Sequence, residues 1–200
     1  LRDDTVRSVL GLPGVARAAN VTYLTMQVRR ASAGDAAPSS DNDDVRAMVV
    51  GVAPGGPGEP GHPKQLIAGR HIIRSHYEAV ADSASGLRLN EQIQIRRQHY
   101  QVVGLTQRMV SSNGDPMIFI PLRDAQEAQF LKDNDAIWQQ RRRTASNPAV
   151  ARNQVPGLLE ALLAAQESNP YVNAVLVQLE NGANAHETAE AIRRWKRLQV

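Results

Sequence analysis

The sequence predicts an α+β domain with a mixed sheet, helices on one face of that sheet, and a small β-rich insertion. The apolar residues outside the insertion alternate with the period of a strand in some segments and follow the period of a helix in others. Their order is strand, strand, helix, helix, strand, helix, which lacks the regular alternation of a parallel α/β sheet. Of the 200 residues, 42% are hydrophobic and 22% are charged. These fractions are near globular averages and exclude wholesale disorder.

The first predicted elements are a short helix and a long strand. Residues 1–11 place their apolar side chains on one helical face, and Gly11 ends the helix. From residue 15 to 28, apolar residues come at nearly every second position, which predicts a strand. The alternation slips between Tyr23 and Leu24, and we expect a β-bulge there.

A second, buried strand is predicted over residues 45–52. The small, polar and acidic residues 31–44 predict an exposed loop, so the two strands are expected to form an antiparallel pair. Residues 53–63 hold eight glycines or prolines in eleven positions, which predicts a floppy connection without regular structure.

A β-rich segment follows between residues 69 and 116. Strands are predicted at residues 92–95 and 100–105, whereas residues 71–85 fit either a helix or a strand. A further short strand is predicted at residues 117–120. The domain organisation expected from this pattern is an inserted β-rich subdomain, residues 69–116, within an α+β subdomain, residues 1–68 and 117–200.

The last third of the chain predicts helices around one strand. From Pro121 the apolar period becomes that of a helix. Residues 132–154 are polar and predict an extension of this helix followed by a loop, and Pro156 begins a second helix. Residues 172–179 predict a buried strand, and residues 185–198 predict the final helix.

Composition excludes several classes of function. The chain has no Cys, which excludes a disulfide scaffold, a thiolate metal site and a cysteine nucleophile. A net charge of +3 is a weak field for nucleic acid, and the clusters at residues 141–143 and 193–197 fit solvated faces, so no nucleic-acid partner is expected. No segment approaches the ~20 apolar residues that cross a bilayer. Because the chain begins at Leu1 and not at Met, we expect it to be an excerpt of a longer protein.

The motifs that carry chemistry are incomplete. The glycine-rich residues 53–61 lack the Gly-Lys-Ser/Thr ending of a phosphate-binding loop. The acidic cluster at residues 41–44 lacks the glycine and glutamate of a calcium loop, since Arg46 and Val52 occupy those positions.

The other candidate residues do not form a set either. No paired carboxylate or Cys completes a metal site with the five histidines, His62, His71, His76, His99 and His186. Asp82 and Glu91 are the nearest candidates for an acid/base pair, and both lie beside turn-like residues. We therefore expect no catalytic, cofactor-binding or metal-binding residues, and a protein that is not an enzyme.

Several short motifs occur in a characteristic order along the chain. They are Leu12-Pro13-Gly14-Val15, Val49-Val50-Gly51-Val52, Leu66-Ile67-Ala68-Gly69-Arg70, Leu89-Asn90-Glu91-Gln92-Ile93-Gln94-Ile95, Tyr100-Gln101-Val102-Val103-Gly104-Leu105, Ile118-Phe119-Ile120-Pro121-Leu122 with Ala125, and Val175-Leu176-Val177-Gln178-Leu179 before Ala191-Ile192. This succession resembles the periplasmic core domain of MacB/FtsX-type ABC transporter permeases, including the MacB-like and DevC-like exporters. The resemblance covers residues 12–130 and 172–198.

The resemblance implies a porter-like α+β unit, interrupted by a sabre-like β-rich subdomain, on the periplasmic side of the bacterial inner membrane. It implies a non-catalytic domain that transmits ATP-driven motion to export a substrate or to engage a periplasmic partner. The expected partners are a cytoplasmic ABC ATPase, reached through a membrane part, and a second permease copy. A periplasmic adaptor and an outer-membrane channel are further candidates. The alternative is a stand-alone periplasmic module that binds a small molecule or a protein.

Overall fold

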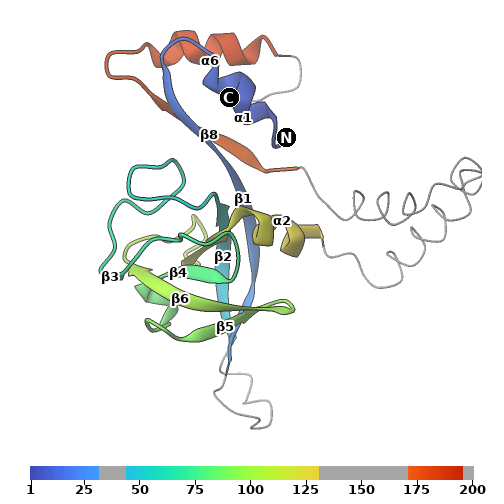
Figure 1. Ribbon diagram of the computed structural model, residues 1–200, viewed down its shortest axis with the longest axis vertical. Coiled ribbons are helices and arrows are strands. Elements are labelled where there is room, and N and C mark those ends of the chain that lie inside the picture. The colour runs from blue at the N-terminus through green and yellow to red at the C-terminus, as the bar shows by residue number, and fades with distance from the viewer. Residues whose placement is uncertain (32–43, 131–170, 196–200) are drawn as a thin grey trace, which may run out of the picture.

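The computed structural model describes residues 1–31, 44–130 and 171–195 of the chain. This part contains eight strands and few helices, and its sheet mixes parallel and antiparallel pairs, so the α+β class is confirmed (Figure 1). The elements are α1 (Thr5–Leu10), β1 (Val15–Arg30), β2 (Asp44–Val52), β3 (Ala68–Gly69), β4 (Glu78–Asp82), the 3-10 turn η2 (Ser83–Ser85), β5 (Gln92–Ile95), β6 (Gln98–Thr106), β7 (Met117–Pro121), α2 (Leu122–Phe130), β8 (Ala174–Leu179) and α6 (Ala185–Arg193).

Six of the strands close into a barrel. Around the ring, β1 pairs with β2, β2 with β7, β7 with β4, β4 with β6, β6 with β5, and β5 again with β1. The β2–β7 and β4–β6 pairs are parallel and the others are antiparallel. Because the ring closes, each of these strands has a hydrogen-bonded neighbour on both edges, which removes the exposed edges of an open sheet.

The interior of the barrel is a single apolar core to which all six strands contribute. Side chains on alternate positions point inward, as the pleat of a strand requires. Ala125 of α2 belongs to the same core, so this helix closes one end of the barrel. The buried members of the core are 0–4% exposed: Val28, Ala47, Val49, Ala79, Ala81, Leu87, Ile93, Ile95, Tyr100, Val102, Ile118, Ile120 and Ala125.

A second apolar cluster covers part of the outer face of the barrel. The strands contribute Val50, Val52, Val80, Val103 and Phe119, and Val21 joins them from β1. The segment between β2 and β4 supplies the buried Ile72 and the partly buried Leu66, while Ala174 and Leu176 of β8 pack at its edge. We call residues 53–67 the strap, because they cross this cluster.

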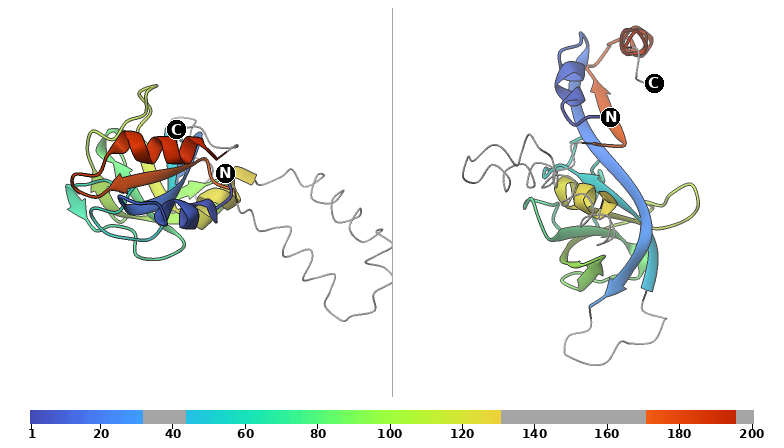
Figure 2. Two further views of the ribbon diagram at one scale, coloured as in Figure 1. Left: turned by 90° about the horizontal axis from the view of Figure 1, so that it is seen from above. Right: turned by 90° about the vertical axis from the view of Figure 1, so that its right-hand side faces the viewer.

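The two ends of the described chain meet in a smaller unit beside the barrel. Residues 15–21 of β1 pair with β8 to form a two-stranded antiparallel sheet, which we call the end ribbon. The amino group of Leu1 donates a hydrogen bond to the carbonyl of Val172, 2.9 Å away. The helices α1 and α6 lie on either side of β8 in both views of Figure 2. Thus the first half of β1 belongs to the end ribbon and its second half belongs to the barrel.

The expected bulge between Tyr23 and Leu24 was wrong. The β1–β2 register runs without interruption from Thr22 to Arg29, and the irregularity in β1 lies between Val15 and Arg17 instead. The apolar pattern slips near Tyr23 because β1 exchanges one neighbour for another there: it pairs with β8 up to Val21 and with β2 from Thr22 onward.

The barrel also crosses the boundaries that the sequence placed at residues 69 and 116. The strands β4, β5 and β6 lie within residues 69–116, yet they pair with β1 and β7 and share their core. The chain returns to the barrel after each excursion, so the hydrogen-bonded unit is not contiguous in sequence. The expected subdomain of residues 69–116 is therefore corrected to a barrel that includes the second half of β1, β2 and β7.

The other predicted strands lie where the sequence places them, but β8 is only partly buried and not the buried strand expected at residues 172–179. The ambiguous residues 71–85 contain the strand β4 followed by the 3-10 turn η2. The helices predicted at residues 132–154 and after Pro156, and the last residues of the final helix, lie outside the described residues. Within the described ranges, no helix combines the length and the apolar character that crossing a bilayer requires.

Candidate functional site

The strap joins the barrel to the end ribbon. Gly61 has a φ of +92°, and a Cβ atom at this position would lie 2.8 Å from Cγ1 of Val21 and 3.3 Å from Cγ1 of Val52. Arg17 of β1 donates from Nη1 to the carbonyl oxygen of Gly58 at 3.2 Å, and the same nitrogen lies 3.4 Å from Oε1 of Glu59. The prediction of a floppy connection was wrong, because the absence of side chains at glycine permits this close packing.

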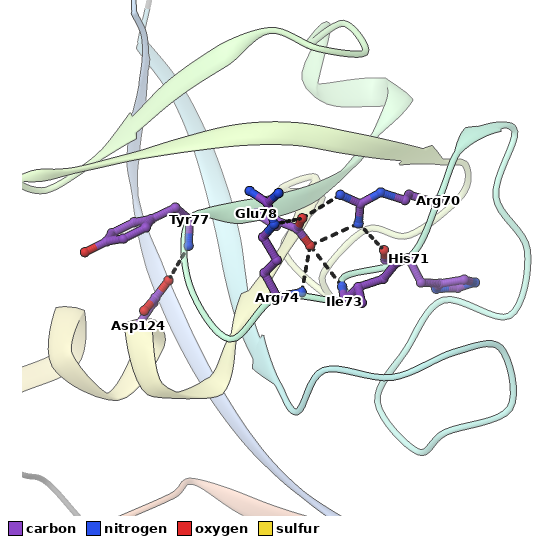
Figure 3. Close-up of polar contacts among 7 residues, drawn as sticks. All are labelled: Arg70, His71, Ile73, Arg74, Tyr77, Glu78 and Asp124. Atoms are coloured by element: carbon purple, nitrogen blue, oxygen red, sulfur yellow. Dashed lines mark hydrogen bonds and ion pairs between the residues drawn. The ribbon is translucent and has the colours of Figure 1, made fainter.

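The segment after the strap forms a second structured region, the anchored loop, residues 70–77 (Figure 3). It runs from β3 to β4, whose first residue, Glu78, is 3% exposed. The carboxylate of Glu78 accepts hydrogen bonds from the backbone N–H groups of Ile73 and Arg74 at 2.9 and 3.0 Å. It also accepts two bonds from the guanidinium group of Arg70, at 2.5 and 3.0 Å.

These contacts keep Glu78 ionised. The hydrogen bonds from Arg70 are the largest cause, and together with the backbone donors they lower the pKa of Glu78 from 4.5 to about 2, although burial acts in the opposite direction. Bidentate pairing of Arg with a carboxylate is among the stronger hydrogen-bonded arrangements in proteins. The buried carboxylate therefore fixes the backbone of the loop from below.

A second buried carboxylate holds the end of the anchored loop. Asp124, in the first turn of α2, accepts a hydrogen bond from the backbone N–H of Tyr77 at 3.0 Å, and its other oxygen lies 2.5 Å from Nδ1 of His76. The φ of Tyr77 is +62°. Bulky residues rarely adopt this left-handed conformation, and it persists only where the surroundings impose it. The contact with Asp124 is one of those constraints (Figure 3).

The loop presents apolar side chains to solvent although its backbone is fixed. Within the loop, Ile72 is fully buried, whereas Ile73 is 68% and Tyr77 is 53% exposed. The side chain of Arg74 is 80% exposed, and its Nε lies 3.7 Å from Glu78. The carboxylates of the region are thus buried, and its cations and two of its large apolar groups lie at the surface.

The sequence did not single out Glu78 or Asp124. Each precedes apolar residues of a buried element, Ala79-Val80-Ala81 in one case and Ala125 in the other, and a carboxylate in such a position is costly without partners. That placement is the signal in the sequence that points to these two residues.

The residues that the sequence did single out have local structural roles. The carboxylate of Asp82 caps η2 by accepting from the backbone N–H of Ala84, and its other oxygen accepts from the backbone N–H of Met109. Glu91 accepts from the backbone N–H of Arg88 and lies 3.7 Å from Arg30. The structure therefore does not bring Asp82 and Glu91 together as an acid/base pair.

The histidines are dispersed, apart from one pair. The rings of His62 and His71 are 5.9 Å apart, and burial, followed by the charge of His62, lowers the pKa of His71. His76 contacts Asp124, while His99 and His186 lie on β6 and α6. Among the described residues, no group of three or more potential metal ligands converges. Asp41 and residues 141–143 fall outside them.

One hollow lies apart from the anchored loop, with a volume of about 470 Å³. It is shallow and lined by Arg30, Arg88, Leu89, Asn90 and Glu91. Pockets for small organic ligands are mostly apolar and enclosed. With a single apolar residue in its wall, this hollow does not favour a small-molecule binding module.

The fold and its closed barrel can now be compared with known proteins. The family model of the MacB-like periplasmic core domain matches residues 1–195. The chain belongs to this family. The resemblance carried by the ordered motifs is therefore confirmed, and the chain is a periplasmic or extracellular domain of a MacB-like ABC transporter, not an enzyme in itself. Membership places it with a membrane transporter and its ATPase partner.

The chain was also compared with solved structures. The chain is similar to the periplasmic region of MacB from Actinobacillus actinomycetemcomitans, with a TM-score of 0.54 and 9% identity over 97% of this chain and 73% of that chain. It is also similar to the extracellular domain of the noncanonic ABC-type transporter YknZ from Gram-positive bacteria, with a TM-score of 0.48 and 11% identity over 89% of each chain. No curated protein sequence matches the chain.

Proposed function

We propose that this MacB-like domain transmits ATP-driven motion of an inner-membrane permease to the periplasm, and thereby exports a substrate or engages a periplasmic partner. The observation that carries the proposal is the path of β1. This strand has 16 residues, which at the rise of a strand is a length of about 50 Å. It begins beside α1 in the end ribbon and ends in the wall of the barrel (Figure 1).

A strand with this path supports transmission because its two halves are held in different units. Movement of α1 and α6 would displace the end ribbon, and β1 would carry the displacement into the barrel. The contacts of the strap with Arg17 and Val21 brace β1 where its pairing changes. Two-state mechanical coupling requires stiff elements of this kind between its moving parts.

Membership of the transporter family supports the ATPase partner, and the other partners are part of the proposal. The ATPase is a separate domain or subunit in the cytoplasm, reached through the membrane part, and a second permease copy forms a dimer with the first. A periplasmic adaptor and an outer-membrane channel complete an efflux path. The domain itself provides motion and a binding surface, and it performs no chemistry.

The proposal is tested on the full transporter that contains this domain. Because the domain has no Cys, a spin label at Arg97→Cys, in the exposed turn between β5 and β6, reports on the barrel. We expect the label-to-label distance between two permease copies to change when ATP is added and to be trapped by vanadate. An unchanged distance during continuing ATP hydrolysis would contradict transmission, and the lack of any measurable distance would contradict the dimer.

A further inference from the structure

The anchored loop combines a fixed backbone with exposed apolar side chains. Four hydrogen bonds to Glu78 and one from Tyr77 to Asp124 fix it from below. The backbone carbonyl of Tyr77 additionally accepts from the N–H of Gln101, at 3.0 Å. Fixing a surface loop in one conformation lowers the entropy that a binding partner must remove.

The side chains that this backbone displays are of the kinds that dominate protein interfaces. Tyr and Arg are enriched among the residues that carry most of the binding energy. Tyr77 and Arg74 both lie at the surface, together with Ile73. The left-handed conformation of Tyr77 adds a cost to the folded domain. Such strain is concentrated at functional sites.

The charge of the surface indicates the chemistry of the partner. Glu78 and Asp124 are buried and satisfied by donors within the domain, so they present no negative charge to a neighbour. The guanidinium group of Arg74 is at the surface, and that of Arg70 is partly exposed beside it. A complementary surface therefore carries carboxylates around an apolar recess that accepts Ile73 and Tyr77.

We infer that the anchored loop is a docking surface for a protein partner with an acidic, apolar-centred contact site. A membrane surface is the less suitable occupant. Membrane binding grows with the apolar area inserted and does not require a fixed backbone, and the loop offers only Ile73 and Tyr77 as large exposed apolar groups. The loop also belongs to the barrel, since both β3 and β4 pair with barrel strand β6.

This inference deepens the partner engagement in the proposed function and rests on it. The experiment uses the full transporter in its native membranes, with the photo-reactive residue benzoylphenylalanine at position 73. Val110 is the matched control position, because it is also an exposed apolar residue of the barrel region. It lies away from the anchored loop, since its neighbour Met109 is hydrogen-bonded to Asp82 at the end of β4 opposite Glu78. We expect illumination to cross-link position 73, but not position 110, to a protein.

Charge variants then decide whether this cross-link reports the inferred surface. Arg74→Glu should lower its yield about tenfold, because it places a carboxylate against carboxylates. Arg74→Gln, which adds no repulsion toward Glu78, should lower it less, and Arg97→Glu should leave it unchanged. The backbone N–H of Arg74 that anchors the loop is kept in both variants, and thermal unfolding verifies that they fold. The cross-linked peptide of the partner should contain Asp or Glu beside apolar residues.

Every other result overturns the docking surface. One group of such results is a cross-link to lipid, to a second copy of this chain or within the same chain. A second group is a cross-link to a protein that Arg74→Glu does not weaken, or whose cross-linked peptide lacks acidic residues. The last group is equal yields at positions 73 and 110, or no cross-link at all. The ATP-driven distance change at Arg97→Cys is measured in parallel. If it persists while the cross-link fails, only the docking surface is wrong, whereas its loss removes the proposed function itself.

Discussion

The barrel and the end ribbon share the strand β1, yet they are stabilised in different ways. In the barrel every strand has two hydrogen-bonded neighbours, and side chains from all six strands are buried in one core. In the end ribbon β8 has no fully buried residue. Stability within a protein varies with buried apolar contacts and protected hydrogen bonds. The difference teaches that one strand can be buried in a core at one end and packed in a smaller, more exposed unit at the other, so that it joins two units of unequal stability.

The largest expected effect is the loss of stability from a substitution in the core of the barrel, compared with one in the end ribbon. Ile118→Ala removes a fully buried side chain of the core, and we expect it to lower the free energy of unfolding by about 2–5 kcal/mol. Val177→Ala, at a half-buried position of β8, should cost about 1 kcal/mol. Urea denaturation of both variants measures the difference. Equal losses would show that the two units are equally well packed.

The second expected effect is a loss of folding stability at acidic pH through Glu78. Because the pKa of Glu78 is lower in the folded protein than its ordinary value of 4.5, the ion pair stabilises fully above pH 5. This contribution, on the order of 3 kcal/mol, is lost as the pH falls from 5 towards 2. We expect Glu78→Gln to be less stable than the wild type at pH 6, with a difference that shrinks at pH 3.

Urea titrations at both pH values provide this measurement, and a matched carboxylate lies in α6. The pKa of Glu190 is also lowered, chiefly by its hydrogen bond with Arg193, but this side chain lies at the surface and is 48% exposed. Glu190→Gln should therefore change stability much less. A difference between Glu78→Gln and wild type that stays constant with pH would contradict the ion-pair account and favour a packing effect.

A third change acts on the contact between the two units. Gly61→Ala introduces a methyl group against Val21 and Val52 at a φ of +92°, and we expect a loss of about 2 kcal/mol. Gly182→Ala is the matched control, since its φ is +85° and nothing lies within 4 Å. Hydrogen exchange should show faster opening at the start of the strap in Gly61→Ala alone. The same exchange in both variants would mean that the cost comes from backbone strain and not from the contact.

The smallest effect sharpens the comparison without breaking either unit. Arg17→Ala removes the exposed contacts of β1 with Gly58 and Glu59. We expect a loss below about 1 kcal/mol that disappears at high salt, because exposed ion pairs are weak and screened. Amides of the strap should exchange faster, while those of β5 and β6 stay protected. Faster exchange in β6 would indicate that the strap stabilises the whole barrel.

The spacing of apolar and turn residues predicted most individual strands, but it did not predict that the strands close into a barrel. The apolar run in residues 45–52 and the helix after Pro121 are properties of neighbouring residues, so composition, period and turn residues reveal them. The pairing of Val28 with Ile95 and of Val80 with Phe119 joins strands that are far apart in sequence. No local pattern encodes such a pairing, and the predicted boundary at residues 69 and 116 divided the barrel for this reason.

The candidate site shows the same limit. The basic residues of the loop after Gly69 are visible in the sequence, but the fixed backbone of the loop depends on Glu78 and on Asp124, which contacts it from α2. The packing of the strap depends on Val21 and Leu176, one far upstream and the other far downstream of Gly61. Glycines that predict flexibility in isolation instead permit close approach when a partner surface is present.

The sequence by itself determined the class of the fold, the positions of most strands and, through the order of its motifs, the transporter family, because these depend on the order and spacing of residues along one chain. Only the tertiary structure decided that β1 belongs to two units, that the strap is packed and that two buried carboxylates fix an exposed loop. Those features depend on contacts between segments that are distant in sequence, and such contacts form only when the barrel closes.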